Sequence, residues 1–224
     1  MLRVESLRKT MGAFSLCIDE LRIDGPGVYG LMGANGCGKS TAAKLICGVA
    51  KPDGGSVRTG LSSREVTLVP RKPYIMNDTV YRNLAYPLKV RGIDPREKCE
   101  EYLGLIGFAE RRREQARGLS GGEMQKLALA RAMIFDPKLI ILDEAMTDLD
   151  LDSLDMFMGM VLDRQRRDPA IWIVISHHLA QIRRLCGRVF FMSGGRIAAQ
   201  GPTEELLRSE HPCVRRYMRS EGLG

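Results

Sequence analysis

Residues 33–41, Gly-Ala-Asn-Gly-Cys-Gly-Lys-Ser-Thr, constrain the fold of this chain more than any other stretch. They match the pattern G-x-x-x-x-G-K-[ST], in which small residues let backbone N–H groups close around phosphate oxygens. An apolar run at 27–32 precedes the loop, and residues suited to a helix follow at 40–46. A strand, a glycine loop and a helix N-terminus together form an anion site, because the helix dipole adds positive potential. The stretch predicts a sheet-based fold that binds a nucleoside triphosphate.

A pair of acids, Asp143 and Glu144, follows an apolar run at residues 139–142. A P-loop fold places acids at the C-terminal end of such a strand beside the phosphates. Within the loop, Lys39 would supply a point charge to the β- and γ-phosphates, and Ser40 would offer its hydroxyl to Mg²⁺. Asp143 would hold the same metal through water, which leaves Glu144 free to orient or deprotonate an attacking water. Together the two stretches predict a hydrolytic site.

The length of 224 residues fits one large domain, or one domain with a substantial insertion. Hydrophobic residues make up 44% of the chain, which is enough for a well-formed core. The longest apolar runs, at 139–142 and 170–175, are far shorter than the ~20 residues that a membrane-spanning helix needs. Residues 1–5 lack the apolar stretch of a signal peptide. These features favour a soluble, intracellular protein.

The chain is basic, with a formal net charge of +7, which suits nucleic acid, acidic lipid or a charged protein as a partner. Its tightest basic cluster is Arg111, Arg112 and Arg113, but Glu110 and Glu114 flank it. We interpret the cluster as the solvated end of a helix, since runs of charge usually form solvated faces. No aromatic residues interleave it, so nucleic acid is not expected as a partner.

The six cysteines show no spacing typical of a metal site, and reduced thiols are the simplest interpretation. Cys37 differs from the others because it lies inside the phosphate loop, at the N-terminus of the expected helix. That setting lowers a thiol pKa. We nevertheless interpret Cys37 as a small residue that fills space in the loop.

Strand signals occupy the two ends of the chain. Short strands are expected at 4–7, 14–18, 21–23, 56–59 and 66–69. The continuous apolar strands at 139–142 and 171–175 are typical of a parallel sheet that is covered on both faces. A hairpin is expected from 189–192 and 196–200, with a polar helix near 151–167 and a last helix that begins at Thr203.

The middle of the chain is helical. From about residue 78 to 135 strand signals are absent, Asp94 and Pro95 can open one helix, and Ser120 can cap another. The sequence therefore predicts an α/β fold: a mostly parallel sheet flanked by helices, an N-terminal antiparallel β part, and an inserted helical subdomain. The nucleotide-binding core would span 1–72 and 136–224, and the helical subdomain 73–135.

A second anion site is expected at Leu-Ser-Gly-Gly-Glu, residues 119–123, because a Ser cap and two glycines leave several N–H groups free at a helix N-terminus. The order of phosphate loop, this signature and the acidic pair resembles that of the ATP-binding cassette (ABC) family, whose signature reads L-S-G-G-[QE]. The resemblance extends over essentially the whole chain. It implies a P-loop ATPase whose two subunits join head to tail and enclose two ATP molecules.

The resemblance assigns roles by position. Glu144 would be the catalytic glutamate, and His177, which follows the strand at 171–175, would be a switch histidine that reaches the γ-phosphate. Ser40 and Asp143 would hold Mg²⁺. Residues 147–150 resemble the loop that touches the partner across the dimer. The signature glycines would contact ATP held by the partner subunit. The residues expected to bind the nucleotide are those of the phosphate loop, the signature and the end of the 147–150 loop: Gly33, Asn35, Gly36, Cys37, Gly38, Lys39, Ser40, Thr41, Ser120, Gly121, Gly122 and Asp150.

Three positions depart from the family pattern. The family pattern has a glutamine after residue 70, in a segment called the Q-loop, but this chain has Arg71 there. An arginine donates hydrogen bonds but cannot ligate a metal. We expect its guanidinium to turn away from Mg²⁺, towards a phosphate oxygen or an acid in a neighbouring loop. The family pattern has an aromatic residue near position 11 that stacks on adenine, but this chain has Met11 there. Phe14 or a flat apolar contact could take the place of the aromatic residue. Ala145 stands where the family usually has proline.

The resemblance to uptake-type cassettes, which includes residues 79–88, implies the ATP-hydrolysing subunit of a transporter. Such a subunit would be peripheral at the cytoplasmic face of the cell membrane, would dimerise, and would dock integral membrane permease subunits in a groove lined by 72–92. The solute would be small, and an inorganic anion such as tungstate or phosphate is one candidate. Two alternatives remain open: a soluble cassette ATPase of the assembly or cell-division type, and an ATP-binding switch whose hydrolysis is weak because of Arg71.

Overall fold

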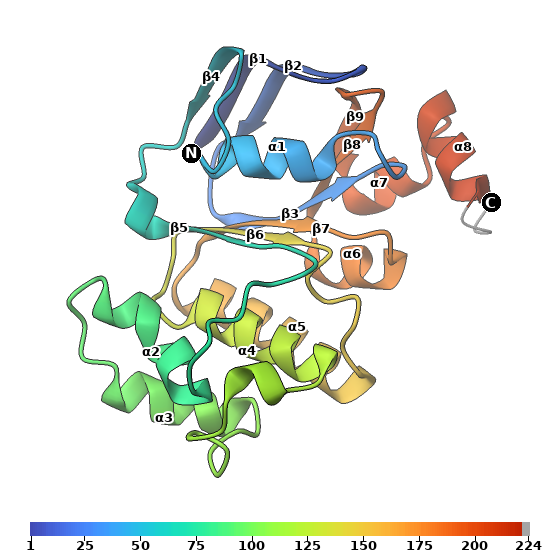
Figure 1. The fold of residues 1–224 in the computed structure, drawn as a ribbon. Coiled ribbons are helices and arrows are strands. Elements are labelled where there is room, and N and C mark those ends of the chain that lie inside the picture. The colour runs from blue at the N-terminus through green and yellow to red at the C-terminus, as the bar shows by residue number, and fades with distance from the viewer. Residues whose placement is uncertain (221–224) are drawn as a thin grey trace.

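A computed structural model describes residues 1–220 and shows two β-sheets above a group of helices (Figure 1). The smaller sheet has three antiparallel strands in the order β2-β1-β4. These strands are β1 (Leu2–Met11), β2 (Phe14–Ile23) and β4 (Gly54–Arg58). The N-terminal antiparallel part of the predicted fold is therefore present.

The larger sheet has six strands in the order β5-β6-β7-β3-β8-β9. Its first five strands run parallel, and only β9 is antiparallel to its neighbour β8. In chain order the strands are β3 (Gly27–Met32), β5 (Val66–Val69), β6 (Leu139–Asp143), β7 (Ile171–Ile175), β8 (Arg188–Ser193) and β9 (Arg196–Pro202). The phosphate loop follows β3, and β6 and β7 lie beside it, so the C-terminal ends of these strands meet at one edge.

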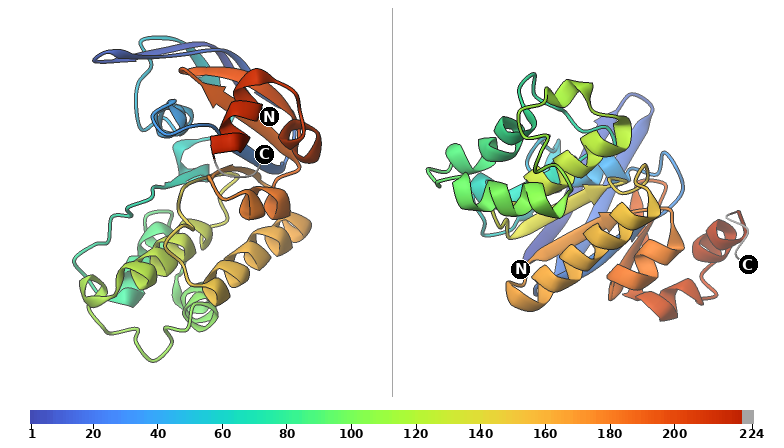
Figure 2. Two further views of the ribbon diagram at one scale, coloured as in Figure 1. Left: turned by 90° about the vertical axis from the view of Figure 1, so that its right-hand side faces the viewer. Right: turned by 90° about the horizontal axis from the view of Figure 1, so that it is seen from below.

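Helices cover both faces of the larger sheet. Helix α1 (Lys39–Ile46) lies between the two sheets, and the other helices lie on the opposite side or at the C-terminal end (Figures 1 and 2). These are α2 (Val80–Lys89), α3 (Arg96–Leu105), α4 (Gly121–Met133), α5 (Leu151–Arg167), α6 (Leu179–Leu185), α7 (Thr203–Leu207) and α8 (Pro212–Ser220). Two single turns of 3₁₀ helix, Ser63–Glu65 and Ala116–Gly118, complete the described elements.

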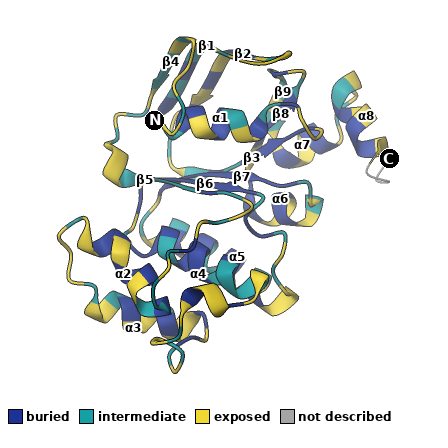
Figure 3. Ribbon diagram, in the orientation of Figure 1, coloured by how far each residue is buried: buried dark blue, intermediate teal, exposed yellow. Residues whose placement is uncertain are grey.

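The alternation of side chains along the central strands divides the core into two layers. On β6, Ile141 packs with α1 and the small sheet, whereas Ile140 and Leu142 pack with the helices of the other face. Trp172 of β7 belongs to the helical side and is fully buried. Both faces of these strands are buried in Figure 3, as expected for strands that are apolar at every position.

The N-terminal strands are longer than predicted. Two separate strands were expected at 14–18 and 21–23, but β2 runs without a break over ten residues. Continuous pairing with β1, from Leu2↔Ile23 to Met11↔Phe14, carries the polar residues Asp19 and Glu20 through the strand. Backbone pairing with β1 in the three-stranded sheet thus outweighs the low strand propensity of acidic residues.

Helices α2, α3 and α4 lie together on the side of the larger sheet opposite α1, and they follow β5 and precede β6 in the chain (Figure 1). Helix α4 begins after Ser120 as expected, but α3 begins at Arg96 with Pro95 as its cap, one residue later than the predicted start. We keep 73–135 as the proposed bounds of the helical subdomain. Within residues 1–220, no helix combines the length and the apolar character needed to cross a bilayer.

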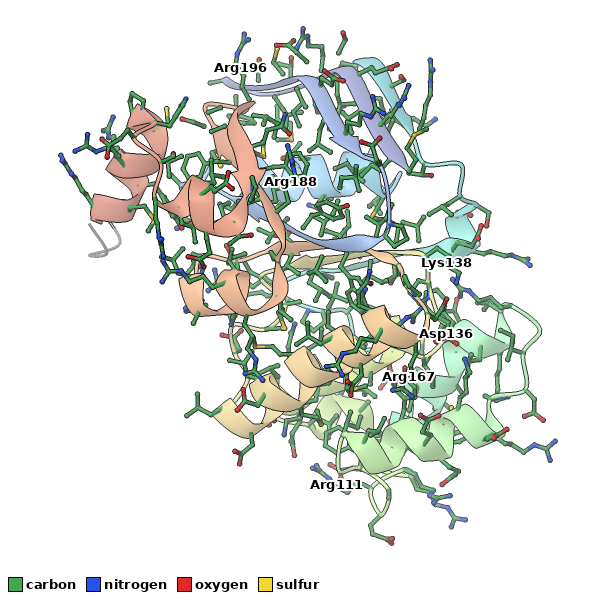
Figure 4. The ribbon with its side chains drawn as sticks, turned by 180° about the vertical axis from the view of Figure 1, so that it is seen from behind. Arg111, Asp136, Lys138, Arg167, Arg188 and Arg196 are labelled. Carbon is green, nitrogen blue, oxygen red and sulfur yellow. The ribbon has the colours of Figure 1, made fainter. Side chains whose placement is uncertain are left out.

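The basic cluster at 111–113 is tied into the helical subdomain by ion pairs. Arg111 pairs with Glu114 and Glu123, and Arg112 pairs with Glu100 at 2.7 Å. Figure 4 shows Arg111 at the end of the helical group that lies farthest from the sheets. The cluster lies in a turn between α3 and α4, and not at a helix end as interpreted from the sequence.

A buried arginine joins α5 to the loop that enters β6. The Arg164 guanidinium donates to the carbonyl oxygens of Met133 and Pro137 and to the carboxylates of Asp136 and Asp168, at 2.9 to 3.3 Å. Its side chain is only 8% exposed. Asp136 is labelled in Figure 4, near the junction of α5 with the strand layer.

Replacing Arg164 with methionine is expected to lower the free energy of unfolding by about 2 to 3 kcal/mol, because buried carbonyl and carboxylate groups lose a charged donor. Urea unfolding followed by circular dichroism measures the change. Arg167→Met, at an exposed position on the same helix, is the matched control and should alter stability little. Equal effects of the two substitutions would contradict the structural role of Arg164.

Candidate nucleotide-binding and catalytic site

The phosphate loop is built by glycines whose backbone conformations other residues rarely adopt. Gly33 has φ of 141°, and a Cβ atom there would lie 2.2 Å from the carbonyl oxygen of Met192. Gly38, the N-cap of α1, has φ of 107°. The loop therefore folds back tightly onto β8 and leads directly into the N-terminus of α1, where free backbone N–H groups can bind an anion.

Lys39 is held over this loop. Its side chain is buried, and Nζ donates to the carbonyl oxygens of Gly33 and Ala34 at 2.7 and 3.1 Å. The ammonium group thus bridges the beginning of the loop, where it can exchange backbone oxygens for phosphate oxygens. Asn35 and Gly36 are exposed at the tip of the loop. The predicted wrapping of the phosphates by residues 35–41 stays a prediction.

Cys37 is buried within the loop, and burial raises the pKa of its thiol despite the opposing charge of Lys39. The expectation that the helix N-terminus lowers this pKa is therefore wrong, because desolvation of the thiolate outweighs the dipole. Cys37 packs beside Gly33, in keeping with its interpretation as a small filling residue. All six cysteines are free thiols.

Ser40 and Asp143 meet although they are far apart in the chain. The Ser40 hydroxyl donates to Asp143 Oδ1 at 3.0 Å. Asp143 is buried, and burial raises the pKa of its carboxyl above the usual value, while the hydrogen bond from Ser40 opposes the shift. A hydroxyl and a carboxylate oxygen are hard ligands that suit Mg²⁺, which keeps water and phosphate oxygens as its other ligands. The pair therefore fits the predicted metal site.

Residues 1–220 hold no cluster of three or more His, Cys, Asp and Glu side chains that could bind a metal by themselves. We keep Ser40 and Asp143 as the proposed protein ligands of Mg²⁺.

Glu144 follows β6 in a left-handed backbone conformation, with φ of 52°. Its N–H donates to the carbonyl oxygen of Ile175 at 3.0 Å, which holds it against the end of β7. Oε2 lies 3.2 Å from Nη1 of Arg71, and Oε1 lies 3.8 Å from Nδ1 of His177. The expectation that Arg71 would turn towards an acid in a neighbouring loop agrees with this contact.

His177 reaches the site from the end of β7. Its ring lies 4.1 Å from that of His178, centroid to centroid. Ser176 stabilises the turn that joins β7 to α6. Its hydroxyl oxygen accepts a hydrogen bond from the N–H of His178 at 3.0 Å, and its hydroxyl donates to the side-chain oxygen of Gln181 at 2.7 Å. This turn directs His177 towards Glu144 and leaves its side chain 35% exposed.

A cavity of about 350 Å³ joins these groups. It is lined by Gly33, Ala34, Asn35, Arg71, Glu144, His177, Tyr217 and Ser220. The fold thus brings together the beginning of the phosphate loop, the proposed catalytic glutamate and the proposed switch histidine. A nucleotide whose phosphates lie on the loop would direct its terminal phosphate towards Glu144 and His177.

Tyr217 and Ser220 were not predicted as parts of this cavity. They belong to α8, whose position is fixed by packing such as the edge-on contact of Tyr217 with Phe191 of β8, at 5.4 Å between ring centroids. The spacing of Val214, Tyr217 and Met218, at positions i, i+3 and i+4, could have indicated a helix there. It carries no information about which cavity the helix would border.

The signature residues lie in the other part of the molecule. Ser120 caps α4 with a capping box: its N–H donates to Glu123 Oε2 at 2.8 Å, and its oxygen accepts from the Glu123 N–H at 3.4 Å. Arg111, together with this box, lowers the pKa of Glu123 to about 2. Gly121 and Gly122 begin the helix. Because α4 and α1 lie in different parts of Figure 1, the chain does not bring its signature to its own phosphate loop.

Asp150 is placed as a structural residue. It caps α5, accepting from the N–H of Ser153 at 2.8 Å, and pairs with Lys126 of α4 at 3.4 Å. The bonds to Ser153 lower its pKa to about 2. A Cβ atom at Gly122 would lie 3.3 Å from the carbonyl oxygen of Asp148. The signature and the loop at 147–150 therefore lie next to each other.

A buried amide connects α4 to the turn that follows β6. The Gln125 side chain on α4 donates to the carbonyl oxygen of Ala145, the residue after Glu144. Local sequence does not indicate this contact, because a glutamine within a helix is usually solvated. Near the other end of the site, Thr41 contacts the sulfur of Met11 at 3.9 Å, which places Met11 beside the first turn of α1.

Comparisons with known proteins agree with this arrangement. A family model described as ABC transporter matches residues 20–147. The tungstate uptake system ATP-binding protein TupC of Peptoclostridium acidaminophilum is 32% identical over 205 residues, which cover 88% of this chain and 96% of that protein. The methionine import ATP-binding protein MetN 1 of Listeria monocytogenes serovar 1/2a is 30% identical over 212 residues, covering 87% of this chain and 63% of that protein.

A solved structure of the ATP-binding subunit of an ABC transporter superposes with a TM-score of 0.83 at 23% identity, covering 100% of this chain and 94% of that one. At this identity the likeness concerns the fold, and the predicted fold class is confirmed. The chain spans 63% of the length of the MetN relative, whereas it spans nearly all of TupC.

Proposed function

The chain belongs to the ABC transporter family, and from this premise we propose that it is the ATP-hydrolysing subunit of a transporter that takes up a small solute. The observation that carries the proposal is the match to TupC, which extends over 96% of that protein and has uptake of tungstate in its name. Tungstate or a similar oxyanion is accordingly our first candidate for the solute.

In the proposed reaction, the backbone of the phosphate loop and Lys39 bind the phosphates of ATP, and Ser40 and Asp143 hold Mg²⁺. The ion would neutralise part of the charge on the β- and γ-phosphates. Glu144 accepts a proton from the attacking water, and His177 contacts the γ-phosphate across the shared cavity. Of these residues, Glu144 and His177 line the cavity.

The remaining contact to the γ-phosphate would come from a second copy of the chain. Ser120, Gly121 and Gly122 present the N-terminus of α4 on a surface remote from the phosphate loop of the same chain. A head-to-tail dimer would place this helix end on the partner's ATP and would supply free N–H groups to its terminal phosphate. We propose a homodimer with two such composite sites.

A second hollow is our proposed contact site for the membrane subunits. A groove of about 480 Å³ lies between β5, α2 and α4, and its lining includes Tyr74, Tyr86, Arg91, Arg131 and Phe135. Tyr74 and Tyr86 are 70% and 53% exposed, which is unusual for residues of their size. We propose that this groove receives a short helix of the permease and holds the chain peripherally at the cytoplasmic face of the membrane.

The charges in this groove specify the helix further. The Arg131 guanidinium donates to the side-chain oxygen of Asn83 and to the carbonyl oxygen of Tyr74. The Arg91 guanidinium donates to the carbonyl oxygens of Arg64 and Pro87. It also lies over the Phe135 ring, 3.6 Å from the ring centroid. Within residues 1–220, neither guanidinium has an ion-pair partner. Burial lowers the pKa of Arg131, so a carboxylate on the docked helix would relieve the cost of this charge. We propose that the docked helix carries an acidic residue.

Replacing Tyr86 with glutamate is expected to release the protein from membranes of its native host, because the new charge meets apolar surface and repels the proposed acid. Fractionation after a wash in about 1 M salt, where the Debye length is only about 3 Å, separates docking from surface electrostatics. Native protein should stay with the membranes, as should Leu105→Glu, the same change at an exposed site on α3. Native protein found wholly in the soluble fraction would favour the assembly-factor alternative.

Deletion of the gene tests the proposal that the transported solute is tungstate. Cells without the protein should accumulate less tungsten from micromolar tungstate, as measured by elemental mass spectrometry, and the wild-type gene should restore accumulation while Glu144→Gln should not. Normal tungsten accumulation with defective uptake of methionine would instead assign the solute class of the other relative.

A further inference from the structure

The carboxylate of Glu144 is occupied by an arginine that the family pattern does not place there. Arg71 Nη1 lies 3.2 Å from Oε2, and His177 faces the other oxygen, Oε1, at 3.8 Å. Among the described residues, Arg71 makes no other ion pair. Both oxygens that could accept a hydrogen bond from an attacking water therefore have a cationic or potentially cationic neighbour.

The two partners differ in their freedom to move. Glu144 is 13% exposed, and its backbone is fixed between the ends of β6 and β7. Arg71 is 57% exposed and belongs to the segment 70–79, which has no regular secondary structure. Only the Glu144 side of the pair is shielded from solvent, so water can solvate the exposed Arg71 guanidinium when the contact breaks. Movement of Arg71 and its segment, and not of Glu144, would therefore make or break the contact.

The same segment borders the groove. Pro70, Pro73 and Tyr74 line the groove between β5 and α2, whereas Arg71 lines the catalytic cavity. Pro70 and Arg71 are consecutive residues, so the wall of the groove continues directly into the wall of the cavity. A helix seated in the groove would press on Pro70 and Tyr74 and would shift Arg71 with them.

We propose that Arg71 is a positioning residue that restrains the Glu144 carboxylate in the isolated protein and keeps its basal ATP hydrolysis low. Occupation of the groove moves the segment 70–79, separates Arg71 from Glu144 and frees Oε2 to accept the proton of the attacking water. The restraint itself rests on the ATPase reaction alone, and only its release rests on the proposed docking of a membrane subunit.

The restraint is tested by steady-state ATP hydrolysis of the isolated protein. Arg71→Gln is expected to raise kcat several-fold, equivalent to about 1 kcal/mol of barrier, with little change in KM. Arg71→Lys keeps the positive charge and should stay near the wild-type rate. Lys72→Gln removes a charge from the next residue, which is exposed and outside the cavity, and should leave the rate unchanged.

A fall in kcat for Arg71→Gln would overturn the proposal, because it would show that Arg71 stabilises charge in the transition state. An unchanged kcat would overturn it as well. Thermal unfolding of each variant distinguishes these outcomes from loss of the fold.

The release is tested separately with the membrane subunits reconstituted in lipid vesicles. Wild-type hydrolysis should be stimulated by the partner more strongly than that of Arg71→Gln, which is already released. Equal stimulation would overturn the proposed release. If no membrane subunit binds while Arg71→Gln still raises kcat in isolation, the transport role fails and the restraint stands.

Discussion

Replacing Glu144 with glutamine is expected to lower kcat for ATP hydrolysis by roughly 100- to 10,000-fold, a loss of about 3 to 5 kcal/mol of barrier reduction. The amide keeps the shape of the side chain but cannot accept a proton from water. Because phosphate binding depends on other residues, the variant should still bind ATP. It should therefore accumulate the ATP-bound dimer, which size-exclusion chromatography with light scattering would detect with ATP and Mg²⁺ but not with ADP.

Glu110→Gln provides the control for this experiment, since it makes the same change at an exposed position of the helical subdomain. It should hydrolyse ATP at the wild-type rate. A Glu144→Gln protein with nearly normal kcat would assign the proton acceptor to another group. A monomer at saturating ATP and micromolar protein would count against the composite site in the isolated chain.

Two inactive variants should restore hydrolysis when they are mixed. Lys39→Ala removes the charged donor of the phosphate loop and is expected to weaken ATP binding by roughly 100-fold, or about 3 kcal/mol. Gly121→Asp places a carboxylate at the start of α4, where a Cβ atom has open space and an acid suits the helix N-terminus. The variant should fold normally, yet its new charge would repel the γ-phosphate of the partner's ATP.

In a mixed dimer, the intact phosphate loop of the Gly121→Asp subunit faces the intact signature of the Lys39→Ala subunit. One complete site forms, so the mixture should hydrolyse ATP although neither variant does alone. Gly25→Asp adds the same charge at an open position of the other lobe and should remain active by itself. Failure of the mixture to regain activity, with both variants folded, would show that each chain completes its own site or that hydrolysis needs both sites at once.

The sequence by itself determined the elements of the site and their order. The glycine pattern at 33–41 has few conformations available to it, and the run 139–142 is apolar at every position, so the loop, the strand and the acids that follow could be read locally. Ser120 is likewise readable as a cap, because capping depends on residues only three positions apart. The resemblance to the ABC family rests on these local patterns, and the family match confirms it.

Tertiary structure alone decided which side chains meet. Ser40 reaches Asp143 only because β3 and β6 lie on either side of β7 in one sheet, and this strand order leaves no trace in local sequence. The Gln125 contact to Ala145 depends on the packing of α4 against the catalytic strand.

The pairing of Arg71 with Glu144 is the clearest case. The sequence showed that an arginine replaces the expected glutamine and that it cannot ligate a metal, but several acids were available to it. The end of β5 places Arg71 at the cavity, and the left-handed turn after β6 directs Glu144 towards it at 3.2 Å. Local chemistry thus limited what each residue can do, whereas long-range packing selected its partner, because contacts between distant segments depend on the whole fold.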